Sequence, residues 1–238
     1  WGFYHKITVY HLEAGLRTNY KWEPYPEEIN RRLISQLATY HLCSSQKSVE
    51  NLKKEGITEN VILVGQTGLD LLSNLTITYK KKVLITMHRR ENWEDMKHWF
   101  IEFEKLANQY PDYEFIFPIH WNPTIRKVAQ QILHKVKTIE PLNHREMVGE
   151  LASCSLIITD SGGLQEEGSF LQKKIIVCRK ETERPEVLNY YSELCPEPTK
   201  LKNLVEKYLK NPIPTEVIYP YGRGKSYQQV LTLLMRSS

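Results

Sequence analysis

Two short runs in the first 31 residues bring carboxylate and guanidinium groups together. Each run has an acidic side chain with an arginine four positions later: Glu13 with Arg17, and Glu27 with Arg31. Carboxylates can transfer protons and arginines can bind a pyrophosphate, so this combination suits acid–base chemistry on an anionic substrate. The same spacing also fits ion pairs within a helix or loop, which is the purely structural interpretation.

Two later clusters place polar residues directly after apolar, strand-like runs. His88 and Arg89 follow one run, and the turn Ser161, Gly162, Gly163 follows another. A histidine beside cations can meet a diphosphate and deliver a proton near neutral pH. Glycines that open a helix let an anion approach its unpaired N–H groups. Ligands of open α/β sheets bind outside the carboxyl ends of the strands, so these clusters indicate an enzyme.

The elements that must position these residues alternate between apolar runs and amphipathic stretches, which predicts βαβ units and a parallel sheet. We expect strands at 7–10, 40–43, 61–64, 82–86, 114–118, 136–139, 156–159 and 174–178. We expect helices at 26–37, 46–55, 93–109, 125–133, 145–152, 163–170, 200–210 and 225–235. Ser45 and Asn143 are suitable N-caps, and Gly56 is a natural helix stop.

Composition excludes several classes of protein. The 238 residues are 41% hydrophobic and 25% charged with a net charge of +4, which is ordinary for a globular protein and lacks a nucleic-acid footprint. No apolar run approaches the length of a membrane span. The cysteines at 43, 154, 178 and 195 show neither a CxxC pair nor metal-ligand spacing, which favours a reducing, cytoplasmic compartment.

Six motifs in order resemble those of the non-hydrolysing UDP-N-acetylglucosamine 2-epimerases. They are EAGLRT, PEExNR, HRREN, HxNP, TDSGGxQEE and TERPE, and the likeness covers nearly the whole chain. The resemblance implies two Rossmann-like α/β domains of glycosyltransferase-B type. It further implies a homodimer, no metal, no nicotinamide cofactor, and activation by substrate at a second site.

The resemblance also assigns roles to residues. Glu13, Glu27 and His88 match the catalytic positions of the family. The other matched residues would bind the UDP-sugar: Arg17, Arg31, Arg89, His120, Asn122, Met147, Ser161, Gly162, Gly163, Glu167 and Arg184. Glu167 would take the ribose hydroxyls, and Arg184 would lie near the diphosphate or form a loop salt bridge instead. Glu28, Arg89 and His120 are candidates for the second site.

Two departures from the family pattern stand out. Met147 occupies a position where relatives often carry an aromatic residue near the uracil. The segment Gly65 to Asp70 keeps the glycine and the aspartate of the family pattern, but the residues between these two agree with the pattern only loosely.

The resemblance predicts a domain division and an incomplete start. Residues 1–75 would form the C-terminal part of a first Rossmann-like domain, 76–218 a second, UDP-binding one, and 219–238 a helix crossing back to the first. Only ten residues precede His11, where relatives have further strands. We therefore interpret the chain as a fragment that is inactive alone.

The leading hypothesis is interconversion of UDP-GlcNAc and UDP-ManNAc for cell-surface polysaccharides, by anti elimination of UDP and its re-addition to the glycal. One alternative is a hydrolysing epimerase that releases UDP. Others are a UDP-sugar-binding module inactive through truncation, and a glycosyltransferase of the same architecture. Product analysis, the upstream coding sequence and an added acceptor, respectively, would discriminate these alternatives.

Overall fold

The structure is a computed structural model that describes residues 1–22, 25–89 and 92–236. Arg90 and Glu91, which belong to the HRREN motif, lie outside these ranges. The chain forms two compact units. The first contains Trp1–Asn74, Thr182–Glu186 and Tyr219–Ser238, and the second contains Leu75–Glu181 and Val187–Ile218.

The first unit is built on a three-stranded parallel sheet in the order β1-β2-β3. The strands are β1 (Tyr10–Ala14), β2 (Tyr40–Cys43) and β3 (Val61–Leu63), and the helices are α1 (Glu27–Leu37), α2 (Gln46–Lys54) and α8 (Ser226–Arg236). A small core of Ala14, Cys43, Val49 and Leu52 joins α2 to the sheet. Ser45 caps α2 by accepting a hydrogen bond from Ser48 N, as the sequence predicts.

The first strand lies further along the chain than expected. The sequence predicts a strand at 7–10, but β1 begins at Tyr10 and itself carries Glu13. Pairing with β2 starts at Tyr10 and Tyr40, whose rings stack 4.8 Å apart. The preceding residues form turns, in which Lys6 has φ +55°. The expected strand position was therefore wrong, because pairing with β2 and not apolar character sets where the strand starts.

The second unit contains a six-stranded parallel sheet in the order β6-β5-β4-β7-β8-β9. Its strands are β4 (Lys82–Thr86), β5 (Glu114–Pro118), β6 (Lys137–Ile139), β7 (Leu156–Thr159), β8 (Lys174–Val177) and β9 (Ser192–Leu194). Numbered within the unit, this is the order 3-2-1-4-5-6 of a Rossmann-type sheet. The strand order reverses between β4 and β7, and sheets of this type bind ligands at that switch point.

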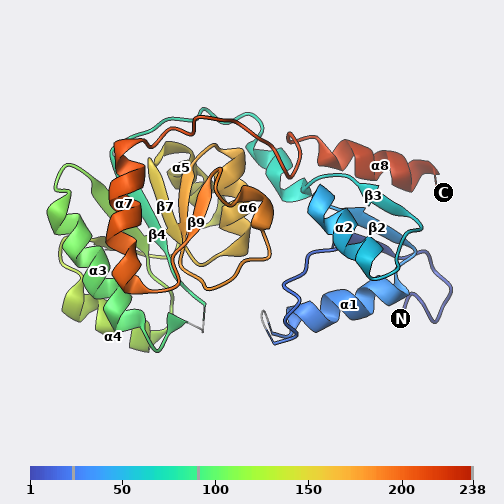
Figure 1. Cartoon of the computed structure of the whole chain (residues 1–238), viewed down its shortest axis with the longest axis horizontal. Helices are drawn as coiled ribbons and strands as arrows, with labels where there is room; N and C mark the ends of the chain where they lie inside the picture. Colours follow the sequence, from blue (N-terminus) through green and yellow to red (C-terminus); the bar gives the residue numbers. More distant parts are fainter. Residues whose placement is uncertain (23–24, 90–91, 237–238) are drawn as a thin grey trace. The chain divides into compact units, whose positions relative to one another are not determined.

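Helices cover both faces of this sheet (Figure 1). They are α3 (Met96–Gln109), α4 (Pro123–Ile132), α5 (His144–Ser153), α6 (Gly162–Phe170) and α7 (Leu201–Lys210). The main core packs α3, α4 and α7 on the face that carries Val83, Phe117 and Ile158. On the other face α6 lies so close that a Cβ on Gly168 would meet Ile157 Cδ1 at 2.8 Å. Asn143 forms a capping box with Glu146 at the start of α5, as predicted from its sequence.

Two segments extend the first unit beyond residue 74. Ser45 Oγ donates a hydrogen bond to Glu186 Oε1, and Tyr221 Oη donates to Glu186 Oε2 at 3.1 Å. This explains why Thr182–Glu186 belongs to the first unit, whereas the sequence analysis assigned it to the second domain. The α8 segment also belongs there, because Asp70 accepts hydrogen bonds from Ser226 N and Tyr227 N at the start of that helix.

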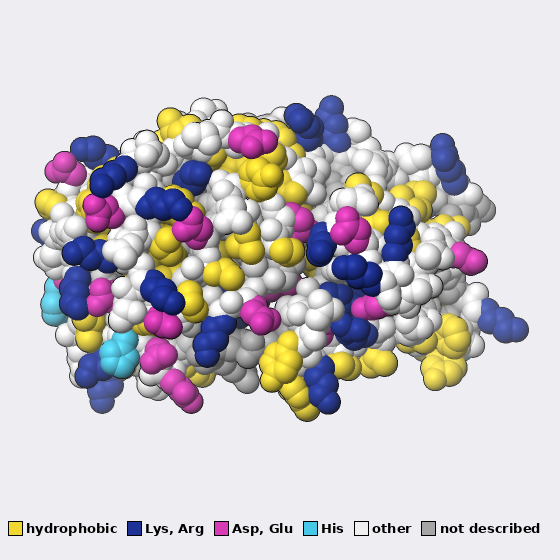
Figure 2. Space-filling model, viewed as in Figure 1, with side chains coloured by type: hydrophobic (Ala, Val, Ile, Leu, Met, Phe, Trp, Pro, Cys, Tyr) yellow, Lys and Arg dark blue, Asp and Glu magenta, His cyan; other side chains and the backbone are white. Residues whose placement is uncertain are grey.

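Figure 2 shows how charged side chains are distributed over one face of the molecule. Basic and acidic side chains are interspersed on the face drawn in Figure 2. Nucleic-acid-binding proteins instead gather basic residues on one face. Within the described ranges, no helix is both long and apolar enough to span a membrane.

Candidate active site

The carboxyl ends of β4 and β7 lie side by side at the switch point of the second sheet, where sheets of this type bind ligands. Val83 to Thr86 pair with Leu156 to Thr159 in parallel register, and the two threonine hydroxyls at the strand ends lie 2.6 Å apart. Both polar clusters predicted from the sequence follow these ends directly. The sheet therefore brings His88 and the Ser161 turn to one edge.

Asp160 organises this edge. Its carboxylate is fully buried and accepts hydrogen bonds from His88 N at 3.1 Å, Arg89 N at 2.9 Å and Asn92 Nδ2 at 3.0 Å. The half-exposed ring of His88 places Nδ1 3.5 Å from Asp160 Oδ1, which is ion-pair range once the ring takes a proton. Asp160 thus fixes the loop that carries His88 and leaves the other ring nitrogen free to face a ligand.

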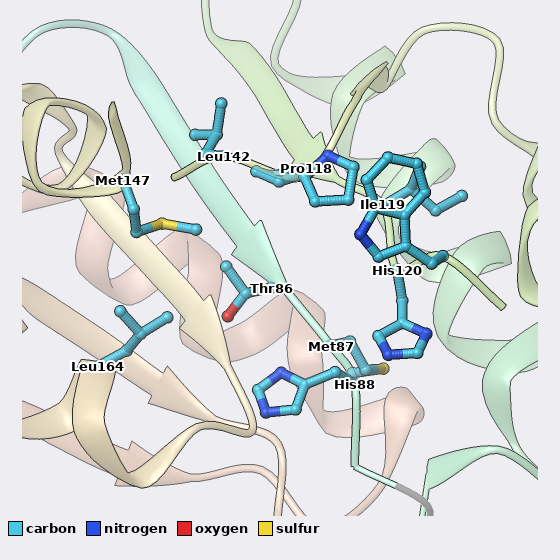
Figure 3. Close-up of a pocket in the computed structure, with 11 residues that line it drawn as sticks. Thr86, Met87, His88, Pro118, Ile119, His120, Leu142, Met147 and Leu164 are labelled. Atoms are coloured by element: carbon cyan, nitrogen blue, oxygen red, sulfur yellow. The ribbon is translucent and has the colours of Figure 1, made fainter. Parts of the chain in front are cut away.

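A cavity of about 280 Å³ opens beside this loop (Figure 3). It is bounded by the ends of β4 and β5, the loop after β6, and the first turns of α5 and α6. Its lining is mostly apolar: Thr86, Met87, His88, Pro118, Ile119, His120, Trp121, Pro141, Leu142, Met147 and Leu164. Three residues predicted from sequence, His88, His120 and Met147, therefore share one cavity. An apolar slot flanked by histidines suits a flat base joined to a charged group.

The HxNP motif is explained by local geometry. His120 Nδ1 accepts a hydrogen bond from Asn122 N at 3.1 Å, which leaves Nε2 to carry the proton of the neutral ring. Asn122 caps α4 by accepting from Thr124 N at 2.9 Å, with Pro123 as the first helical residue. Asn122 thus caps α4 while His120 lines the cavity, and the substrate-binding role that the resemblance implies for Asn122 stays a prediction.

The N-terminus of α6 is open. Ser161 is its N-cap, and its hydroxyl makes no capping bond. A Cβ on Gly163 would meet nothing within 4 Å, and Gly163 has no left-handed backbone angle. The fold itself therefore does not require glycine at this position, which is consistent with close approach of an anion to the helix.

Glu167, one turn further along α6, has an unusual environment. Its Oε2 is buried without a hydrogen-bond partner among the described residues, and Oε1 lies 3.4 Å from His144 Nε2. Burial raises the pKa of the Glu167 carboxyl, while His144 acts in the opposite direction. An acceptor left without a donor in this way suits the hydroxyl group of a ligand.

In the first unit, Glu13 lies at an irregularity of β1. The register with β2 shifts between Leu12 and Ala14, and Glu13 adopts φ +59°. Its side chain is exposed, and Oε1 accepts a hydrogen bond from Gln66 Nε2 at 2.8 Å. Glu27 is exposed in the first turn of α1. The helix dipole favours a negative charge at that position.

Arg31 interacts electrostatically with Glu13 and has a second cation, Arg184, close by. Burial and then the neighbouring Arg184 lower the pKa of Arg31, whereas the carboxylates of Glu183, Glu28 and Glu13 act against this. Arg31 Nη1 is buried without a partner among the described residues. Arg184 is itself buried and pairs with Glu183, so it is not a surface salt bridge. Arg31 and Arg184 therefore form a pair of nearby cations that suits an anionic ligand.

His11 is the other titratable group beside Glu13. Burial, followed by the charges of His41 and Arg17, lowers the pKa of His11 to about 4. The two histidines pair across β1 and β2, and both have a buried Nδ1 without a partner among the described residues. His11 is therefore neutral at physiological pH and adds no positive charge beside Glu13.

Arg17 and Glu28 have structural partners that the spacing of the motifs does not reveal. Arg17 does not pair with Glu13; it forms two hydrogen bonds of 2.8 Å with Glu55 and a third with Ser35. Glu28 is fully buried and accepts from Thr18 N and from Arg32. Both residues thus hold the loop between β1 and α1. The structural alternative from the sequence paired Glu13 with Arg17 and Glu27 with Arg31; in the structure Arg17 pairs with Glu55, and the i,i+4 pair of α1 joins Glu28 to Arg32.

No group of three or more His, Cys, Asp or Glu side chains within 1–22, 25–89 and 92–236 is arranged to hold a metal ion. All four cysteines are buried and free. Burial raises the pKa of each thiol, which makes them poor nucleophiles.

Two Rossmann-like parallel α/β units, with a nucleotide-sized cavity at a strand switch point, define an enzyme fold of glycosyltransferase-B type. A family model described as UDP-N-acetylglucosamine 2-epimerase matches residues 1–235, and the chain belongs to that family.

Related proteins agree with this assignment. The UDP-N-acetylglucosamine 2-epimerase of Neisseria meningitidis serogroup A is 35% identical, with 99% of this chain and 71% of the relative aligned. A crystal structure of a Neisseria meningitidis UDP-GlcNAc 2-epimerase bound to UDP-GlcNAc has a TM-score of 0.89 at 34% identity, covering 99% of this chain and 71% of that one. An S. aureus MnaA–UDP structure has a TM-score of 0.92 at 31% identity, with the same coverage.

Proposed function

We propose that this protein interconverts UDP-GlcNAc and UDP-ManNAc without net hydrolysis and supplies cell-surface polysaccharide synthesis. The observation that carries this proposal is the match of an epimerase family model to residues 1–235. It is supported by the likeness to structures that bind UDP-GlcNAc and UDP. The cavity beside His88 is of the size and polarity that a nucleotide base needs.

The chemistry follows from the substrate. The proton on C2 has no adjacent carbonyl, so removing it alone is unfavourable. In an anti elimination, a base takes that proton, the C–H electrons form the C1=C2 double bond, and the C1–O bond breaks with its electrons leaving on UDP. Reprotonation of the glycal at C2 from the other face and return of UDP to C1 then give the epimer.

Each residue contributes a separate part of this reaction. Glu13 and Glu27 would exchange protons with C2 and its surroundings, and His88 would protonate or bind the departing diphosphate. Arg31, Arg184, Arg89 and the α6 N-terminus would stabilise the negative charge on UDP as it leaves. Met147 and its neighbours would hold the base, and Glu167 would accept the ribose hydroxyls. Arg17 would act indirectly, through the loop that it holds.

The remaining proposals concern the assembly and its control. We infer a cytoplasmic homodimer that is activated by substrate at a second site. Arg89 and His120 are the favoured residues for that site, since both belong to loops at the carboxyl edge of the second sheet. The third candidate, Glu28, has both oxygens engaged within the first unit.

Reaction in heavy water tests the proposed function. The natural full-length protein incubated with UDP-GlcNAc in D₂O should form UDP-ManNAc that carries deuterium at C2, with traces of free UDP and glycal. NMR and mass spectrometry of the product would locate the label. Epimerisation without deuterium would exclude elimination, and stoichiometric release of UDP with free ManNAc would show a hydrolysing enzyme.

Replacing Gly163 by alanine tests the diphosphate site on α6. We expect the variant to fold normally and to gain about 0.5–1 kcal/mol of stability, since alanine favours the helix. The added methyl group should obstruct an anion at the helix N-terminus and weaken UDP binding roughly tenfold, or ~1.4 kcal/mol. Calorimetry with UDP would measure this effect.

Gly149→Ala is the matched control, because a Cβ there also meets nothing within 4 Å and Gly149 lies within the neighbouring helix α5. It should gain similar stability and leave UDP affinity unchanged. Equal UDP affinities of Gly163→Ala and the wild type would exclude this helix end as the diphosphate site.

A further inference from the structure

The segment after β3 reaches the proposed catalytic residue Glu13 through one buried side chain. Gln66 is 5% exposed, and its Nε2 donates to Glu13 Oε1 at 2.8 Å. The two residues are 53 positions apart: Glu13 lies in β1, and Gln66 lies three residues after the end of β3, with β2 between these two strands in the sheet. The fold of the first unit thus places the side-chain amide of Gln66 within hydrogen-bond distance of the Glu13 carboxylate.

Gln66 is itself held in place from several directions. Its backbone N donates to Tyr221 O at 2.8 Å, and its Oε1 accepts from Gly68 N. Gly65 has φ +87°, and a Cβ there would lie 2.4 Å from Ser226 Oγ, so the chain needs glycine to lie this close to the α8 segment. Because Oε1 is engaged by Gly68, the NH₂ group of the amide is the end that points to Glu13.

Within residues 1–22, 25–89 and 92–236, Gln66 is the one hydrogen-bond donor to the Glu13 carboxylate. Glu13 lies at the point where β1 departs from regular pairing, and its side chain is exposed. An exposed glutamate samples many rotamers, and fixing one of them costs conformational entropy. A hydrogen bond to one carboxylate oxygen selects an orientation and leaves the second oxygen available for a proton.

We propose that Gln66 is a positioning residue that holds Glu13 as an oriented carboxylate for proton transfer at C2. This proposal rests on the proposed function. In the forward step, Glu13 Oε2 gains the C2 proton while the C–H electron pair forms the double bond and UDP leaves with the C1–O pair. Gln66 transfers no proton and touches no substrate. Its NH₂ group keeps its hydrogen bond to Glu13 Oε1 throughout the reaction.

Two variants of the natural full-length protein separate this role from a structural one. Gln66→Leu removes the donor, and we expect kcat to fall about 10- to 100-fold with KM changed less than about twofold, as for a displaced catalytic group. Gln66→Glu keeps an oxygen for Gly68 N but donates to Glu13 only when its own carboxyl is protonated. Its activity relative to wild type should therefore rise as pH is lowered from about 8 to about 6.

Asp70→Asn is the matched control. Asp70 lies in the same segment and holds the start of α8, because its two carboxylate oxygens accept hydrogen bonds from Ser226 N and Tyr227 N. It should lower the melting temperature while leaving kcat and the pH profile close to wild type. A direct readout is the side-chain NH₂ resonance of Gln66 in ¹H–¹⁵N spectra, which should move in Glu13→Ala and stay in place in Asp70→Asn.

The outcomes are distinct. Each of three results would overturn the positioning role. They are a wild-type kcat in Gln66→Leu, an activity of Gln66→Glu relative to wild type that does not change with pH, and a Gln66 side-chain NH₂ resonance that does not move in Glu13→Ala. A kcat loss in Asp70→Asn as large as that in Gln66→Leu would show that the segment acts only through the fold. A wild-type protein that does not epimerise UDP-GlcNAc would instead overturn the proposed function, whatever the amide resonance shows.

Discussion

Replacing Glu13 by glutamine is expected to lower kcat about a thousandfold, within the range that general acid–base groups contribute. The substitution preserves shape, and the new side-chain oxygen can still accept the hydrogen bond from Gln66 Nε2 that Glu13 receives at 2.8 Å. What is lost is the ability to take and return a proton. Affinity for UDP should stay within about twofold of wild type, since the proton transfer takes place in the transition state.

Steady-state kinetics and UDP calorimetry on the natural full-length protein would measure these two quantities. Glu27→Gln should behave similarly, because Glu27 is the second proposed acid–base group. Glu59→Gln is the control, since Glu59 is an exposed glutamate of the same unit outside the motifs. Wild-type turnover in Glu13→Gln or Glu27→Gln would show that the acid–base assignment is wrong for that residue.

The fold was largely predictable because parallel strands buried on both faces are continuous apolar runs. Leu156–Thr159 and Lys174–Val177 are of this kind, and the structure has strands there. Ser192–Leu194 was missed because it has three residues with a glutamate in the middle, and it pairs at the edge of the sheet. The start of β1 was misplaced because register with β2, which the sequence does not show, determines it.

The candidate site was predictable where a residue touches the cavity and not where it acts through another residue. His88, His120 and Met147 line one cavity, as the positions of their motifs suggest. Asp160 was part of a recognised motif, but its bonds to the His88 loop span 72 positions in sequence. Arg17 was expected at the substrate, yet its main partner Glu55 lies 38 positions away, outside every motif. Long-range polar pairs of this kind become visible only in three dimensions.

Asp160→Asn is expected to destabilise the second unit by about 2–3 kcal/mol and to weaken UDP binding at least tenfold. The buried carboxylate of Asp160 accepts from two backbone N–H groups and from Asn92 Nδ2, which itself also donates to Cys178 O. An asparagine offers one acceptor oxygen, and its NH₂ group would face a donor. Leaving buried donors unsatisfied costs about 1–3 kcal/mol each, and relaxation of the loop would recover part of this.

The same substitution should disturb UDP binding because the Asp160 carboxylate holds the backbone of His88 and Arg89 at the edge of the cavity. Chemical denaturation would measure stability, and calorimetry would measure UDP affinity. Asp112→Asn is the control, because Asp112 is 75% exposed and pairs with Lys81 at the surface, where ion pairs contribute little. If Asp160→Asn unfolds at the wild-type denaturant concentration and binds UDP equally well, this carboxylate does not hold the His88 loop in its binding conformation. A normal stability with weakened UDP binding would instead place Asp160 in direct contact with the ligand.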